Sequence, residues 1–110
     1  MPTTCYIDFS VLLASGVVYG SVSGVLELSS VPRIGESISF LFPGNETAPL
    51  VLPDYSGIRR VTSVIYNPGD PSAPVLLSLE DITLTTSAEA GELFRYFKDA
   101  YGLHGSHYGR

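Results

Sequence analysis

Hydrophobic and polar residues alternate over residues 5–13, and this period of two predicts a β-strand with one buried face. A second alternation over 17–29 predicts another strand, and Ala14-Ser15-Gly16 between them is suited to a turn. Gly20 and Gly24 fall on the inward side of the second strand, where glycine often marks a bend or a close approach of backbone. Tyr6 of the first strand and Tyr19 and Val25 of the second fall on the outward side. The pattern therefore predicts a hairpin within a curved sheet.

Three more strands are predicted, over residues 36–42, 58–66 and 75–84. The inward positions of the last one change phase between Leu79 and Ile82, so a β-bulge is expected at Glu80-Asp81. The longest connection, 43–57, carries three prolines and two glycines and is expected to be irregular. Long connections of this kind are often functional, so this loop is a candidate contact region.

Just before the third strand, a proline restricts the backbone conformation and a glycine allows a turn. Pro32 limits Val31 to an extended conformation, whereas Gly35 permits a turn. Arg33 and Glu36 flank that turn at a spacing that predicts a local ion pair. The stretch is interpreted as the beginning of a strand rather than as a recognition loop.

The C-terminal part predicts one helix. Thr86 and Glu89 match a capping box, and apolar residues then recur at helical spacing over 87–101 until Gly102 ends the helix. Residues 104–110 show no periodicity and are expected to be a flexible tail. The predicted organisation is one β-barrel-like domain over 1–103, with its C-terminal helix, followed by that tail.

These elements predict a mainly β fold with one helix: a small five-stranded antiparallel barrel or a strongly bent sheet, with 87–101 packed on it. In element order the chain resembles SH3-like and OB-like barrels, a likeness that carries no function. Antiparallel pairing of strands two to five in chain order would place Arg33 and Glu36 beside Asp70. It would place Arg59 and Arg60 at the opposite end, beside the 43–57 loop, Asp54 and Glu80-Asp81.

Composition narrows the possible partners. Charged residues make up 15 % of the 110-residue chain, below the usual ~25 %, and so thinly charged a surface favours a homo-oligomer. There are 11 Asp and Glu against 6 Lys and Arg, which disfavours nucleic-acid binding because phosphates are neutralised by cations. Cys5 is the single cysteine, so it is expected to be a buried, inert thiol.

Neither a membrane nor a secretory route is indicated. Eighteen uncharged residues separate Asp8 from Glu27, but serines and the 14–16 turn interrupt them, so a hairpin fits better than a membrane span. No positively charged region precedes the apolar stretch, and a cytoplasmic location is expected.

Catalytic constellations are scarce. The two histidines, His104 and His107, both fall in the expected tail, where a base cannot be held near a nucleophile. Glu80 and Asp81 are adjacent, and neighbours in a strand point to opposite faces, which disfavours an acid–base pair. No metal or other cofactor is indicated, and an enzymatic activity is not favoured.

Aromatic residues point to a contact surface instead. Seven Tyr and five Phe exceed what one small core needs, and tyrosine is enriched at binding surfaces. We therefore expect a non-catalytic protein-interaction or assembly module that self-associates, one version being an inhibitor or immunity-type protein against a basic partner. The alternative is a small-ligand-binding barrel or minor enzyme that uses the barrel mouth. The candidate binding residues are Tyr55, Arg59, Arg60, Glu80 and Tyr19.

Overall fold

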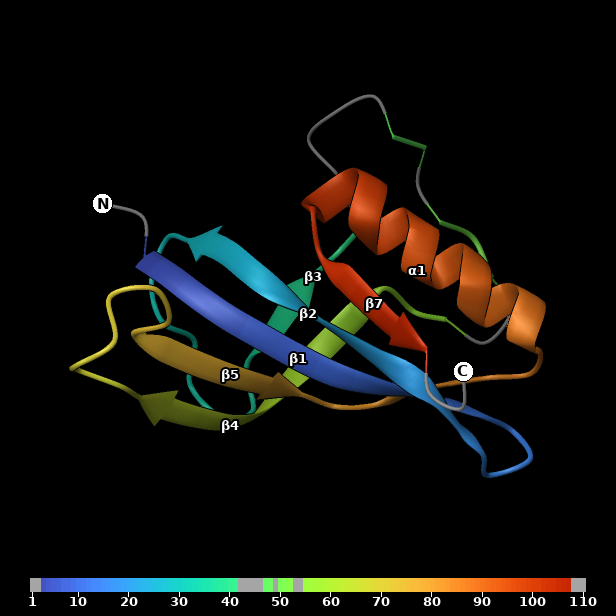
Figure 1. Ribbon diagram of the computed structural model, residues 1–110, viewed down its shortest axis with the longest axis horizontal. Coiled ribbons are helices and arrows are strands. Elements are labelled where there is room, and N and C mark those ends of the chain that lie inside the picture. Colours follow the sequence, from blue (N-terminus) through green and yellow to red (C-terminus); the bar gives the residue numbers. More distant parts are fainter. Residues whose placement is uncertain (1–2, 42–46, 49, 53–54, 108–110) are drawn as a thin grey trace.

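The computed structural model describes residues 3–41, 47–48, 50–52 and 55–107, and it shows a mainly β protein with one helix (Figure 1). The elements are β1 (Thr3–Leu13), β2 (Val18–Leu28), β3 (Ser37–Ser39), β4 (Ile58–Tyr66), β5 (Val75–Leu79), β6 (Ile82–Leu84), α1 (Ser87–Tyr101) and β7 (His104–His107). The strands expected over 5–13, 17–29 and 58–66 and the helix over 87–101 are confirmed. The third strand is shorter than expected, and residue 42 of its predicted span lies outside the described residues.

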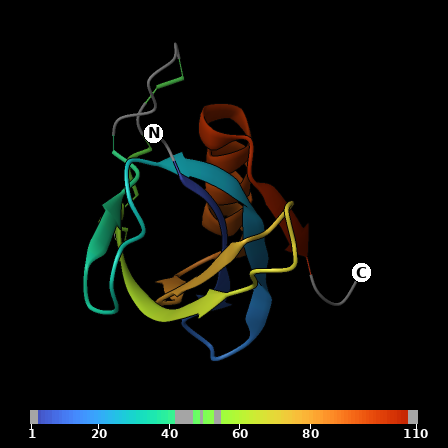
Figure 2. The same ribbon diagram turned by 90° about the vertical axis from the view of Figure 1, so that its left-hand side faces the viewer.

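Within the described residues the strands form one sheet in the order β3-β4-β5-β1-β2-β7, with β6 also paired to β1. The central β1 runs antiparallel to β2 but parallel to β5 and β6. Viewed end-on, the strands curl around a common interior (Figure 2). The sheet is not closed, since β3 and β7 stay at its two edges, so the structure agrees with the bent sheet of the two expected forms and not with the barrel. The expected five antiparallel strands are wrong, because the described part of the sheet has seven strands and includes parallel pairs. The likeness to SH3-like and OB-like barrels gains no support beyond the mainly β class.

Pairing in chain order holds for β3 with β4 and for β4 with β5, but it is wrong for β2, which does not pair with β3. Instead, β5 returns to the sheet beside β1, in parallel. A parallel pair requires a long connection, and the chain between β1 and β5 provides one. The free edge of the apolar β1 therefore accepts β5 rather than remaining exposed.

The phase change at Glu80-Asp81 is confirmed as an interruption, but it is a break between two strands rather than a bulge within one. β5 pairs with Tyr6–Asp8 of β1, and β6 pairs with Val11–Leu13. Across the gap, the backbone N–H of Ser10 donates to Asp81 Oδ1 at 3.2 Å. A side-chain carboxylate thus satisfies a backbone donor that the missing ladder leaves free.

The turn before β3 lies beside the middle of β4. The N–H of Gly35 donates to the Val61 carbonyl at 2.9 Å, and the N–H of Val61 donates to the Glu36 carbonyl at 2.8 Å. The predicted position beside Asp70 is therefore wrong, because β3 pairs with the first half of β4. The predicted local ion pair is present, with Arg33 Nη2 3.7 Å from Glu36 Oε2, and its exposure limits it to about 0–1 kcal/mol.

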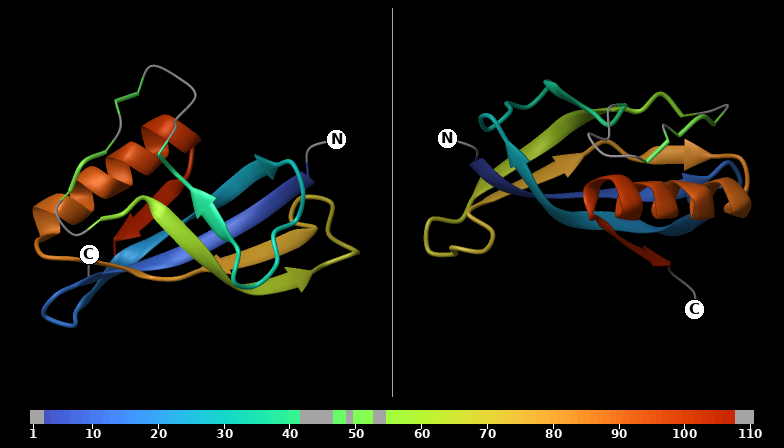
Figure 3. Two further views of the ribbon diagram at one scale, coloured as in Figure 1. Left: turned by 180° about the vertical axis from the view of Figure 1, so that it is seen from behind. Right: turned by 90° about the horizontal axis from the view of Figure 1, so that it is seen from above.

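The core fills the concave side of the sheet and is covered by α1 (Figure 3). Phe97 is fully buried, with ring centroids 5.3 Å from Phe9 and 4.9 Å from Phe40. The inward residues of the central strands are buried beside it: Cys5, Ile7, Phe9, Val11, Val22, Val75, Leu77, Leu79, Ile82 and Leu84. Cys5 is a fully buried core residue, and this burial raises the pKa of its thiol.

Both ends of α1 follow the sequence signals. Thr86 Oγ1 accepts from the Glu89 N–H at 3.2 Å, and the Glu89 carboxylate accepts from the Thr86 N–H at 3.2 Å. Gly102 adopts the left-handed conformation with φ of 70°, and its N–H donates to the Lys98 carbonyl. The helix limits were therefore encoded locally.

Residues 104–107, assigned to a flexible tail from the sequence, instead form β7 beside β2. Residues 108–110 of that tail lie outside the described residues. Glycines make this approach possible: a Cβ at Gly20 would lie 2.1 Å from the Ser106 carbonyl oxygen, and one at Gly24 would lie 2.8 Å from Leu103 Cδ2. The close approach expected at these two inward glycines is confirmed, and the approaching segment is the C-terminal one.

We predict that Gly105→Ala destabilises the seat of β7, because a Cβ there would lie 2.5 Å from Phe94 Cδ2 on α1. Overpacking of this kind costs about 1–3 kcal/mol. Chemical denaturation should show the loss, and hydrogen exchange should accelerate at 104–107. Gly69→Ala is the control, since nothing lies within 4 Å of its Cβ position. Equal stabilities of the two variants would contradict the packing of β7 on α1.

Candidate functional site

The five binding residues proposed from the sequence fall into two groups. Tyr55, Arg59, Arg60 and Glu80 lie around the start of β4, where the Glu80 N–H donates to the Arg60 carbonyl at 2.9 Å. Tyr19 belongs to β2 and contacts other elements. None of the five lines the pockets found along α1, beside the turn before β3 and at the gap between β5 and β6. Their binding role therefore stays a prediction.

Arg59 acts as a local clamp. Its guanidinium donates to the Ile58 carbonyl at 2.8 Å, the Asp81 carbonyl at 3.0 Å and Ser56 Oγ at 3.0 Å. The neighbourhood of Arg59 and Glu80-Asp81 expected from the sequence is confirmed, while Asp54 of that expected group lies outside the described residues. Because these three donors are already bonded within the chain, the contacts indicate a structural role for Arg59 rather than a role in binding an anion.

Tyr19 is turned toward the helix by an irregularity in β2. Gly20 pairs with Val11 and Val18 pairs with Leu12, which leaves Tyr19 as an extra residue. Its ring stacks on His107 at a centroid distance of 4.1 Å and meets Phe94 edge-on at 5.2 Å. The outward position expected for Tyr19 therefore becomes a packing position between β7 and α1.

Tyr55 places its hydroxyl in the interior without a hydrogen-bond partner among the described residues. Its ring lies 6.5 Å from Phe97 by centroid, beside Tyr96 and Tyr101. Burial raises the pKa of Tyr55 far above its ordinary value; Tyr96 reinforces the increase and Arg59 opposes it. The phenol is therefore neutral and costs stability, because a buried polar group without a partner pays its desolvation.

We predict that Tyr55→Phe raises the free energy of unfolding by about 1 kcal/mol, because it removes an unsatisfied hydroxyl. Tyr96→Phe is the matched variant of opposite sign, since the Tyr96 hydroxyl donates to the Phe40 carbonyl and its loss leaves that carbonyl unpaired. Urea titration of both variants measures the difference. A destabilised Tyr55→Phe would show that the hydroxyl has a partner.

The same tyrosine predicts the response to alkaline pH. The folded state holds the pKa of Tyr55 above the ordinary value of about 10, so the neutral form of this side chain contributes stability relative to its phenolate form. This contribution is complete below about pH 10 and is lost progressively as the pH rises above it. Tyr55→Phe should therefore flatten the fall in stability above about pH 10 in pH-dependent denaturation, and an unchanged slope would contradict the burial.

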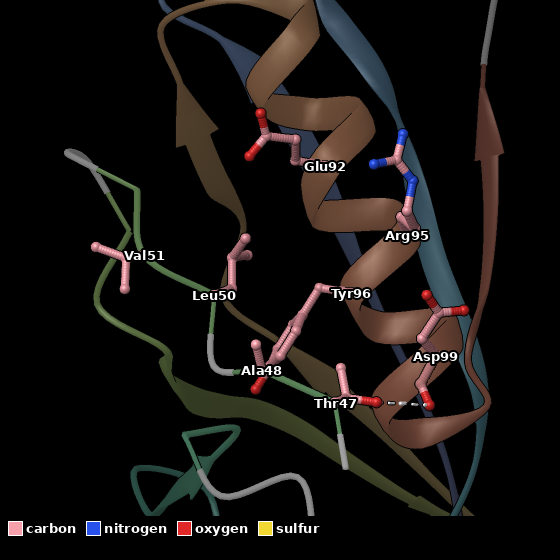
Figure 4. Close-up of a pocket in the computed structure, with 8 residues that line it drawn as sticks. All are labelled: Thr47, Ala48, Leu50, Val51, Glu92, Arg95, Tyr96 and Asp99. Atoms are coloured by element: carbon pink, nitrogen blue, oxygen red, sulfur yellow. Dashed lines mark hydrogen bonds between the residues drawn. The ribbon is translucent and has the colours of Figure 1, made fainter.

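A first pocket, of about 450 Å³, lies between α1 and the described residues of the 47–51 segment (Figure 4). Glu92, Arg95 and Asp99 line its helical side, and Thr47 Oγ1 donates to the Asp99 carbonyl at 3.4 Å. The lining mixes both signs of charge on an exposed helix face. It is typical of a solvated surface rather than of a selective site.

A row of apolar side chains crosses the convex, outer face of the sheet. The register aligns Ile65 of β4, Leu76 of β5, Tyr6 of β1 and Val25 of β2. Ile65 is 50 % exposed and Val25 is 46 % exposed, while Leu76 and Tyr6 are half-buried. We call these four residues the apolar row. Among the described residues no element covers it, since α1 packs on the other side (Figure 2).

A polar hollow of about 310 Å³, the polar notch, adjoins the apolar row on the same face. Hydroxyl-bearing and acidic side chains dominate its lining, which consists of Asp8, Phe9, Ser10, Ser21, Thr62, Ser78, Leu79 and Asp81. It lies where β5 ends and the chain crosses to β6, so β1 has no strand beside it there. Sequence reasoning placed Tyr6 and Val25 outward, but the strand order was needed to align them with β5 and β4.

The described part of the chain was also compared with what a metal site and a membrane-spanning helix require. No group of three or more His, Cys, Asp or Glu side chains there is placed to hold a metal ion. Helix α1, which lies wholly within the described ranges, falls short of the length and apolarity that a membrane crossing requires.

Comparisons of the chain with protein-family models, with curated proteins and with solved structures give no significant match. Its function must therefore be argued from its own geometry.

Proposed function

We propose that this chain is a non-catalytic protein-interaction module whose contact surface is the apolar row on the outer face of the sheet. The observation that supports it is the alignment of four large apolar side chains across four strands, with no described element over them. Apolar patches rimmed by polar residues mark interaction sites on soluble proteins. Here the rim is supplied by serines and by the polar notch.

Tyr6 is the residue of the row whose type is enriched at interface centres, because it combines a large apolar ring with a hydroxyl. Val25, Ile65 and Leu76 add aliphatic area around it. Because these side chains stand on paired strands, they are held in place before a partner arrives, which lowers the entropic cost of binding. A convex and rigid surface of this kind suits a protein partner better than a small molecule, for which concave sites are usual.

Self-association, expected from the sparse charge, is one form of this proposal, with a second copy as the occupant. The cytoplasmic location expected from the sequence also stays a prediction.

We predict that a photo-cross-linking residue placed at Val25 or Leu76 forms protein adducts in the producing cells, whereas one at Ile34 does not. Ile34 is 67 % exposed and belongs to the turn before β3, away from the apolar row. Val25→Thr combined with Ile65→Thr should reduce the adducts formed through position 76 at least tenfold, with little change in melting temperature, because threonine retains the strand preference and removes apolar area. Equal adduct yields at 25, 76 and 34 would contradict the proposal.

A further inference from the structure

The charges on the outer face have one sign across its three central strands. β1, β2 and β5 contain no Lys or Arg, and their charged residues are Asp8 and Glu27, both exposed. Asp81 adds a third carboxylate at the polar notch. The cations of β4 do not neutralise this group: Arg59 reaches Asp81 only through its main-chain carbonyl, and Arg60 is exposed where β4 pairs with β3.

The polar notch offers two carboxylates, Asp8 and Asp81, as acceptors, and two of the donors near them are already used within the chain. Thr62 directs its hydroxyl to the Ser78 carbonyl at 3.1 Å, and the N–H of Ser10 is taken up by Asp81 Oδ1. The Asp8 carboxylate forms no hydrogen bond or ion pair with a described residue. One carboxylate is thus held in place by the backbone and the other faces solvent, and carboxylates bind guanidinium and ammonium groups most strongly.

We infer that the partner of the outer face is a cationic protein that lays apolar side chains on the apolar row and inserts a Lys or Arg side chain into the polar notch. This inference rests on the proposed function and names the chemistry of the partner. Charge complementarity decides the occupant. A two-fold contact between outer faces would bring two surfaces together that both carry carboxylates and no Lys or Arg on their three central strands, and like charges oppose such association.

The direct test uses the cationic group alone as the probe. N-acetyl-arginine methylamide is titrated into the ¹⁵N-labelled chain, with the citrulline analogue as a neutral probe of nearly the same shape. We expect saturable shifts of the amide signals of Ser10 and Ser78 with arginine and none with citrulline. Asp8→Asn and Asp81→Asn should each weaken binding by about tenfold or more, the usual worth of a hydrogen bond to a charged group. Asparagine retains an acceptor for the Ser10 N–H, so the fold is preserved.

Glu27→Gln is the matched control, because Glu27 lies on the same face, outside the polar notch, and accepts from Thr4 Oγ1 at 2.7 Å. It should leave the titration unchanged. Shifts spread equally over distant acidic residues such as Asp70 and Glu92, or shifts that persist in both Asn variants, would overturn the inference. A salt-strengthened dimer that protects the apolar row from exchange would overturn it as well, since the occupant would then be a second copy.

The two proposals fail separately. The arginine titration does not depend on Val25 or Ile65, so the double threonine variant should bind the probe normally even though it loses its protein adducts. Loss of probe binding with intact adducts at 25 and 76 would remove the cationic partner and leave the interaction surface in place.

Discussion

The fold depends on the double pairing of β1. This strand bonds to β2 along one edge and to β5 and then β6 along the other, so it ties the N-terminal hairpin to strands that follow some seventy residues later. Its inward residues, from Cys5 to Val11, are almost fully buried, and Phe9 among them packs against Phe97 of α1. The backbone ladder and the apolar core therefore meet in one strand, and every element that forms the outer face is positioned relative to it.

The polar notch forms where the strand paired with β1 changes from β5 to β6. Between the two partners β1 lacks a strand neighbour, and Asp81 supplies the missing acceptor from its side chain. The residues around this point have little to bury, so the site is lined by serines and carboxylates, whereas the complete ladder beside it carries the apolar row. The polar notch thus arises from an irregularity in strand pairing, and the apolar row arises from the regular ladder beside it.

Two of the candidate binding residues have structural roles: Arg59 donates to Ser56, Ile58 and Asp81, and Tyr55 is buried as a neutral phenol. Tyr19 packs on His107, so one of the expected surface tyrosines and one of the two histidines stabilise the attachment of β7. The outer face instead presents side chains held by paired strands, which is the property that protein recognition uses.

Local patterns alone determined the strands β1, β2 and β4, the helix with its capping box and Gly102, and the presence of an interruption at Glu80-Asp81, because backbone preference and side-chain period act over a few residues. That this interruption separates two strands was not predicted. The sequence also placed Tyr6 and Val25 outward and showed glycines at the point of close approach. Only the tertiary structure decided that β5 joins β1, that 104–107 forms a strand, and that Tyr6, Val25, Ile65 and Leu76 align. Those outcomes depend on which strand edge is free once the core has packed, and edge pairing uses backbone groups that every sequence shares.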